Sequence, residues 1–113
     1  MEKKLPSAYR RFATEQPAVA RAYEALSDAC LDEGPLDRKT IELVKIGIAL
    51  GARLEGGLHS HVRRARDAGA TAEEIRHAIR QGTTTVGFPT MMAALAWAND
   101  VLDARQRASD PKS

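Results

Sequence analysis

The chain has 113 residues, of which 43% are hydrophobic and 28% are charged, and its formal net charge is +2. This size fits one domain, and this composition is that of a globular protein rather than a disordered one. Basic and acidic residues are interspersed, so the charge gives little support for nucleic-acid binding. The single cysteine, Cys30, excludes an intramolecular disulfide, a cysteine-based zinc site and a Cys-x-x-Cys redox pair.

Many alanines and few aromatic residues favour helices over a β-sandwich or barrel. A short helix is expected over about residues 5–14. A second helix begins at Pro17, a residue suited to the first helical position, and Gly34 is expected to end it as a left-handed cap. Its predicted inward face repeats at helical spacing and consists of Val19, Tyr23, Leu26 and Cys30.

The third helix starts after Asp37, whose side chain can accept hydrogen bonds from the amides of Lys39 and Thr40. Its predicted inward stripe is Ile41, Val44 and Ile48, flanked by Leu43, Ile46 and Leu50. Because Glu55-Gly56-Gly57 breaks the pattern, the fourth helix is expected only from about residue 58 to residue 68.

Thr71 and Glu74 have the spacing of a capping box, which predicts a fifth helix to about residue 81. Its inward residues would be Ile75, Ala78 and Ile79. Residues 82–89 fit either an extension of this helix or a bend. The last helix opens at Pro89, with an apolar stripe of Met91, Leu95, Ala98 and Leu102 flanked by Met92 and Val101.

Together these elements predict a single all-α domain over residues 1–113, with about six helices. The core is expected over about residues 17–104, and residues 106–113 are expected to form a disordered polar tail. No signal peptide is recognisable, and the longest strongly apolar stretch, residues 46–52, is too short to span a bilayer. We therefore expect a cytoplasmic protein that binds neither membranes nor nucleic acid.

The residues that could carry out a reaction lie between positions 42 and 61 and include Glu42, His59 and His61. Residues two apart on a helix point to different faces, so only one of the two histidines can meet Glu42. A Glu42–His61 pair could equally be a structural hydrogen bond that ties two helices together. His59 could pair with Glu55 across one turn. His77 is expected at the surface, and no histidine–carboxylate spacing indicates a metal.

Several segments resemble the carboxymuconolactone decarboxylase and alkylhydroperoxidase D superfamily. They are residues 36–43, 49–52, 61–65 and 68–75, together with Gly87-Phe88-Pro89 before an alanine-rich helix. The resemblance covers roughly residues 17–104. It implies a small all-helical bundle that assembles into homo-oligomers, often trimers or hexamers.

The redox branch of this superfamily uses a glutamate, a Cys-x-x-Cys pair and a histidine. Glu42 and His61 match the glutamate and the histidine, but the two cysteine positions hold Leu54 and Gly57. Neither side chain can replace a thiolate nucleophile, and Cys30 is expected inside the fold as a small hydrophobe. Peroxidase or peroxiredoxin activity is therefore the disfavoured alternative.

The decarboxylase branch acts without a cofactor on a carboxylated muconolactone, so the resemblance implies a lyase-type reaction on a small carboxylate. His61 is the candidate acid/base, because histidine ordinarily titrates near pH ~6.5. Glu42 would orient it, and Arg53 and His59 are the candidate substrate-binding residues. No metal or other cofactor is expected.

A third possibility is a non-enzymatic oligomeric binding protein. A pocket blocked by large side chains such as Met91 or Phe88 would support this possibility. Self-association is expected in any case, because the third and last helices carry apolar residues on more than one face, and exposed apolar surface usually marks an interface.

Overall fold

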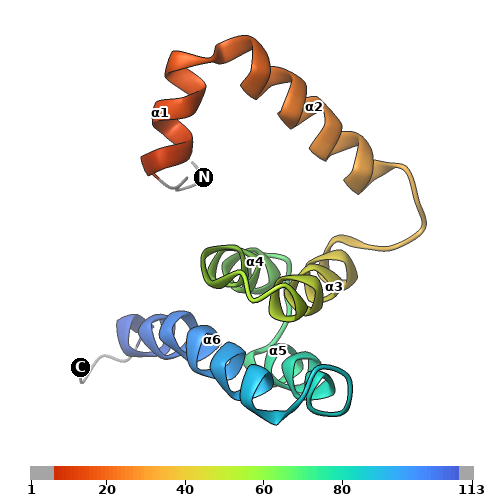
Figure 1. Cartoon of the computed structure of the whole chain (residues 1–113), viewed down its shortest axis with the longest axis vertical. Helices are drawn as coiled ribbons and strands as arrows, with labels where there is room; N and C mark the ends of the chain where they lie inside the picture. Colours follow the sequence, from red (N-terminus) through yellow and green to blue (C-terminus); the bar gives the residue numbers. More distant parts are fainter. Residues whose placement is uncertain (1–6, 110–113) are drawn as a thin grey trace. The chain divides into compact units, whose positions relative to one another are not determined.

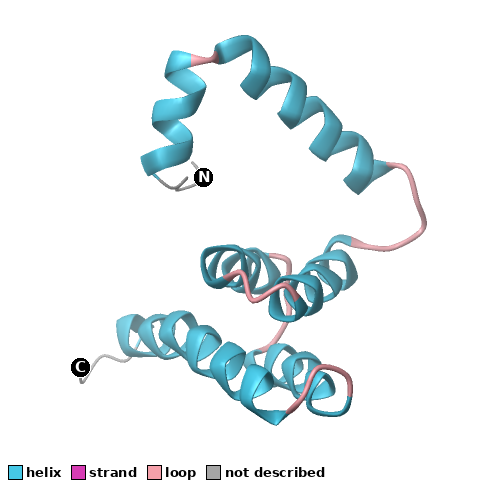
Figure 2. Cartoon of the chain, viewed as in Figure 1, coloured by secondary structure: helices cyan, strands magenta, loops and turns pink. Residues whose placement is uncertain are grey.

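The computed structural model describes residues 7–109, and these residues form helices and loops without a strand (Figure 2). The helices in chain order are α1 (Ser7–Glu15), α2 (Pro17–Asp32), α3 (Arg38–Gly51), α4 (Glu55–Asp67), α5 (Ala72–Arg80), a 3-10 turn η1 (Gln81–Thr84) and α6 (Phe88–Ser109). The predicted all-α fold of about six helices is therefore confirmed. The chain divides into two compact units, residues 1–35 and residues 36–113.

The first unit contains α1 and α2, which contact each other. The hydroxyl of Tyr9 donates to Glu24 over 2.9 Å. Pro17 opens α2 as predicted, but the helix ends at Asp32, and Gly34 is not among the residues with a positive φ. The predicted left-handed cap at Gly34 is therefore wrong.

The apolar face of α2 is not buried in this chain. Ala20 is the buried residue of the helix, whereas Cys30 is exposed. The other members of the predicted inward face are also exposed, namely Val19, Tyr23 and Leu26. The helical periodicity was predicted correctly, but the assignment of these side chains to the interior was wrong.

The second unit consists of two helix pairs, with α3 and α4 side by side and packed on α5 and α6 (Figure 1). Its largest fully buried side chains come from α3, α4 and α5 and fill the space between the pairs: Ile46, Leu58, Val62, Ile75 and Ile79. Ile75 and Ile79 were predicted inward, and both are completely buried.

The buried face of α3 differs from the predicted one. Val44 and Ile48 are 47% and 64% exposed, although they belong to the expected inward stripe. The helix instead buries Glu42, Ile46, Ala49 and Leu50. Both faces are apolar at helical spacing, so the packing of α4, α5 and α6 against one of them decides which is covered.

The α3–α4 connection is shorter than expected. The helix α4 begins at Glu55, so Gly56 and Gly57 are helical rather than part of a break. Arg53 makes the sharp turn between the helices with a φ of 56°, a left-handed conformation that is uncommon for a residue other than glycine. At the other end of α4, Gly69 has a φ of 97° and ends the helix as predicted.

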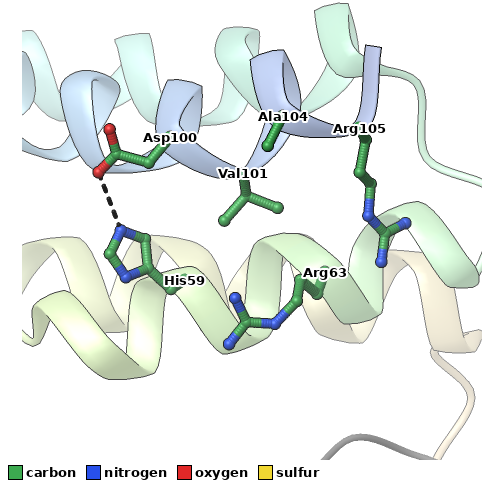
Figure 3. Close-up of a pocket in the computed structure, with 6 residues that line it drawn as sticks. All are labelled: His59, Arg63, Asp100, Val101, Ala104 and Arg105. Carbon is green, nitrogen blue, oxygen red and sulfur yellow. Dashed lines mark hydrogen bonds and ion pairs between the residues drawn. The ribbon is translucent and has the colours of Figure 1, made fainter. Parts of the chain in front are cut away.

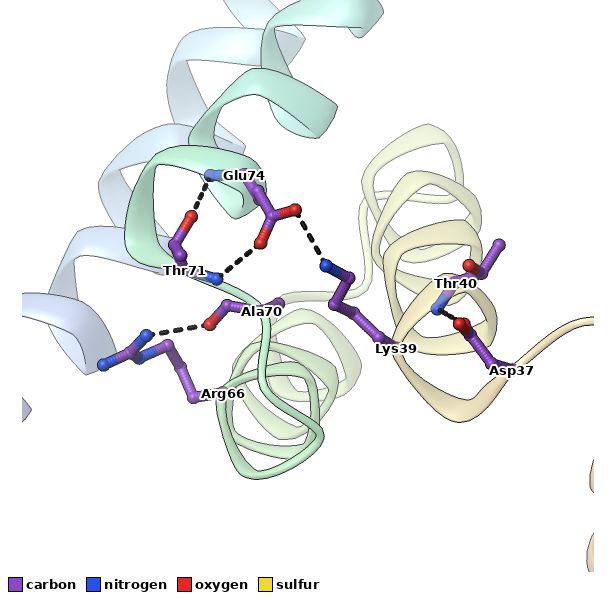
Figure 4. Close-up of polar contacts among 7 residues, drawn as sticks. All are labelled: Asp37, Lys39, Thr40, Arg66, Ala70, Thr71 and Glu74. Carbon is purple, nitrogen blue, oxygen red and sulfur yellow. Dashed lines mark hydrogen bonds and ion pairs between the residues drawn. The ribbon is translucent and has the colours of Figure 1, made fainter.

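Side-chain caps fix the starts of α3 and α5 (Figure 4). Asp37 accepts a hydrogen bond of 2.8 Å from the amide of Thr40. The Thr71 hydroxyl accepts from the Glu74 amide over 3.0 Å, while the Glu74 carboxylate accepts from the Thr71 amide over 2.9 Å. The predicted capping box is confirmed. Glu74 also accepts from Lys39 over 2.9 Å, which connects α5 to α3.

The segment between α5 and α6 is a short 3-10 turn followed by Gly87, whose φ of 102° requires glycine or strain. The helix α6 then continues to residue 109, so residues 106–109 are helical rather than a disordered tail. Residues 110–113 and the start of the first expected helix, residues 5–6, lie outside the described residues. Within residues 7–109, no helix is long and apolar enough to cross a membrane.

Candidate functional site

Glu42 and His61 meet where α3 lies against α4. Glu42 is 2% exposed, which is exceptional for a carboxylate, and its Oε1 lies 2.8 Å from Nδ1 of His61. The His61 side chain is 20% exposed. The structure therefore brings together the two residues predicted as catalytic, and it places the histidine between a buried partner and the surface.

The surroundings of Glu42 keep it ionised. Burial raises the pKa of Glu42, but the hydrogen bond from His61 and the positive charges of His61, Arg64 and Lys45 outweigh burial and hold this pKa below its ordinary value. An ionised carboxylate has no hydrogen to give, so Nδ1 of His61 must donate. In a neutral imidazole this leaves Nε2 with a lone pair that can accept a proton.

Lys45 and Arg64 are charged residues near Glu42 that were not among the predicted site residues. Both are close enough to lower the pKa of Glu42. Lys45 lies three residues after Glu42 on α3, and Arg64 lies three residues after His61 on α4. Residues three apart share a helix face, so the spacing alone could have identified them.

His59 faces a different helix. Its Nε2 lies 3.2 Å from Oδ2 of Asp100 on α6. The predicted pairing with Glu55 is therefore wrong, whereas the prediction that only one histidine can meet Glu42 is confirmed. The reason is geometric, because two residues along a helix turn the side chain by roughly 200°.

Arg53 lies at the far end of α3 from Glu42. Its Nη1 donates to the Thr90 hydroxyl of α6 over 2.7 Å. Glu42 and the end of α3 are separated by about 13 Å along the helix axis. Within one chain, Arg53 and His59 are thus not placed beside the Glu42–His61 pair, and their role in substrate binding stays a prediction.

The remaining candidates lie away from this pair. His77 is exposed on α5, as expected. Phe88 is exposed, whereas Met91 is buried in the core, although both lie near the start of α6. Across the described part of the chain, no group of three or more histidine, cysteine, aspartate or glutamate side chains could hold a metal ion.

Comparisons with known proteins agree with the fold and identify the family. The model of the carboxymuconolactone decarboxylase family matches residues 17–100. The fold is similar to that of an apo carboxymuconolactone decarboxylase family protein from Legionella pneumophila, with a TM-score of 0.77, 26% identity and coverage of 87% of each chain.

A second solved structure, from Burkholderia xenovorans LB400 and provisionally named a carboxymuconolactone decarboxylase, shares the fold. Its TM-score is 0.72 at 22% identity, with coverage of 94% of this chain and 86% of that one. No curated protein sequence matches. Since the family model spans well over half of the chain, this protein belongs to the carboxymuconolactone decarboxylase family.

Proposed function

We propose that this chain is a cofactor-free acid/base enzyme that decarboxylates a small carboxylated lactone or a related acid. The observation that carries the proposal is the 2.8 Å contact between His61 and the buried Glu42. A buried carboxylate that fixes one imidazole nitrogen leaves the other nitrogen available for proton transfer. Family membership supports the substrate class.

The reaction requires one bond to break and one to form. The bond between the substrate carbon and its carboxylate breaks, carbon dioxide leaves, and the electron pair is delocalised as a dienolate. A proton on Nε2 of His61 then forms the new C–H bond. The negative charge of Glu42 stabilises the protonated imidazole before this transfer, and burial strengthens that interaction.

Lys45 and Arg64 give this site the positive charge that an anionic substrate requires. The charges of both lower the pKa of Glu42, which is bonded to the histidine that would carry the proton. An arginine fork matches the geometry of a carboxylate. In this proposal they hold the substrate carboxylates, a role first predicted for Arg53 and His59.

We also propose that the protein works as a homo-oligomer. In the second unit, α3 exposes Val44 and Ile48, and α6 exposes Phe88 and Met92. Large apolar side chains that are exposed together on a helix are typical of an interface. The family resemblance leads us to expect a trimer or a hexamer.

Turnover of carboxymuconolactone, followed as carbon dioxide release, tests the proposed chemistry. His61→Gln should lower kcat/KM by about 10²–10⁴-fold, because it removes the proton carrier. Glu42→Gln should lower it by about 10²-fold, because an amide can no longer enforce the same tautomer or stabilise the cation. His77→Gln, a change at an exposed histidine, is the matched control and should keep the wild-type rate.

Two results would contradict the proposal. If His61→Gln keeps the wild-type rate, His61 has no role in the mechanism. If the wild type shows no turnover, the alternative of a non-enzymatic binding protein is favoured. Peroxide turnover that is lost in Cys30→Ser would instead favour the thiol alternative. Light scattering on the same samples reports the assembly, and a monomer at micromolar concentration contradicts the oligomer.

A further inference from the structure

A concave surface lies in the groove between α4 and α6. Its volume is about 300 Å³, at the small end of the range for ligand pockets. The residues that line it are His59, Arg63, Asp100, Val101, Ala104 and Arg105 (Figure 3). Neither Glu42 nor His61 belongs to it.

Basic side chains run along this groove. Figure 3 shows His59 at one end, Arg105 at the other, and Arg63 between them. Arg105 donates from Nη1 to Asp67 over 3.1 Å, which uses one of its five N–H groups. Arg63 makes no hydrogen bond or ion pair with any residue in 7–109, so its whole guanidinium is open to a ligand.

The acidic residues limit the charge that the groove can accept. Asp100 is bonded to His59 inside it, and Asp67 is bonded to Arg105 at its edge. Because these two carboxylates are already bonded to His59 and Arg105, the positive charge of Arg63 can match one negative charge on a ligand, whereas a second negative charge would lie near Asp100. Val101 and Ala104 add an apolar wall, which an anion without a hydrocarbon part would leave unused.

We propose that this groove is a binding site for a small organic monocarboxylate with a short apolar chain. The carboxylate is held by the guanidinium of Arg63 with a contribution from Arg105, because arginine N–H groups form paired hydrogen bonds to a planar carboxylate. The chain packs on Val101 and Ala104. This site is separate from the Glu42–His61 pair and does not depend on the proposed decarboxylation.

An NMR titration of the full chain tests this site with butyrate, acetate and inorganic phosphate as probes. Butyrate should move the amide signals of α4 and α6 with a Kd on the order of 1 mM. Acetate should bind more weakly because it lacks the apolar chain, and phosphate more weakly because of its second charge. Arg63→Gln should raise the Kd for butyrate about tenfold.

The matched control is Arg38→Gln, which removes the same charge from an exposed arginine on α3 and should leave the Kd unchanged. His61→Gln should also leave it unchanged, so failure of the proposed chemistry and failure of this site are distinguishable. Equal butyrate binding in wild type and Arg63→Gln overturns the proposal. So does phosphate binding as tight as butyrate binding, or no shift at roughly ten times the expected Kd.

Discussion

The two histidines of α4 that bond to carboxylates differ in what surrounds them. His61 contacts Glu42, whose side chain is 3% exposed, whereas His59 contacts Asp100, whose side chain is 66% exposed. The histidines themselves are exposed to similar extents, 20% and 23%. The difference between the pairs therefore comes from the carboxylate and not from the imidazole.

The two histidine–carboxylate contacts are therefore suited to different roles. Around Glu42, water cannot replace a lost partner, so the pair is held in one geometry and the carboxylate remains a fixed charge. Around Asp100, water competes with His59 for the carboxylate, and salt screens the attraction. The first arrangement suits chemistry that needs a fixed proton position, and the second suits a groove whose ligands come and go.

The largest expected effect is on stability. His61→Ala leaves the Glu42 carboxylate buried without its hydrogen-bond partner, which should lower the free energy of unfolding by about 3–5 kcal/mol. His59→Ala, the matched change on the same helix, should lower it by only about 0–1 kcal/mol, because Asp100 is solvated. Urea unfolding measures both, and equal losses would contradict the assignment of Glu42 as the buried partner.

A smaller effect is expected from pH. Because the pKa of Glu42 is lower in the folded chain than in the unfolded chain, the unfolded chain binds more protons in acid. The contribution of the Glu42 carboxylate to stability is therefore fully present above its unfolded pKa of ~4.3. This contribution is lost as the pH falls through the lower pKa that Glu42 has in the folded chain.

The variant Glu42→Gln cannot titrate at this position, so it provides the comparison for that loss. The difference in unfolding free energy between the wild type and Glu42→Gln should shrink as the pH is lowered through this window. Unfolding curves collected at several acidic pH values measure this difference. A difference that stays constant through the window would contradict a lowered pKa at Glu42.

The smallest effect should be the coupling between His59 and Asp100. A double-mutant cycle with His59→Ala and Asp100→Ala should give about 0.2–1 kcal/mol, typical of an exposed ion pair. The coupling should decrease in high salt, because exposed charges are screened. A larger coupling that is insensitive to salt would show that this pair is protected from solvent and would remove the contrast with Glu42.

How far the sequence predicts the fold depends on how local the signal is. The capping box of Thr71 and Glu74 involves four consecutive residues, and it was predicted correctly because such hydrogen bonds need no other element. The buried face of α3 was not predicted, because Val44 and Ile46 are both apolar and only the packing of other helices distinguishes them.

The candidate site shows the same limit. Glu42 and His61 were paired through their family spacing, since 19 residues of separation give no local signal. His59 and Asp100 are 41 residues apart and belong to no recognised motif, so their contact could not be predicted. The exposed apolar face of α2 was misassigned for a related reason, because periodicity shows that a face is apolar but not what covers it.

The hydrogen bond between Nδ1 of His61 and Glu42 also has a stereochemical consequence. With Nδ1 occupied by the carboxylate, only Nε2 can exchange a proton with a substrate, and the imidazole plane is fixed by a buried group. In the proposed reaction the proton would therefore reach a planar carbon from a single direction. For a substrate held in one orientation, product formed in heavy water would carry deuterium on one face of that carbon, so the labelled product would have a single handedness.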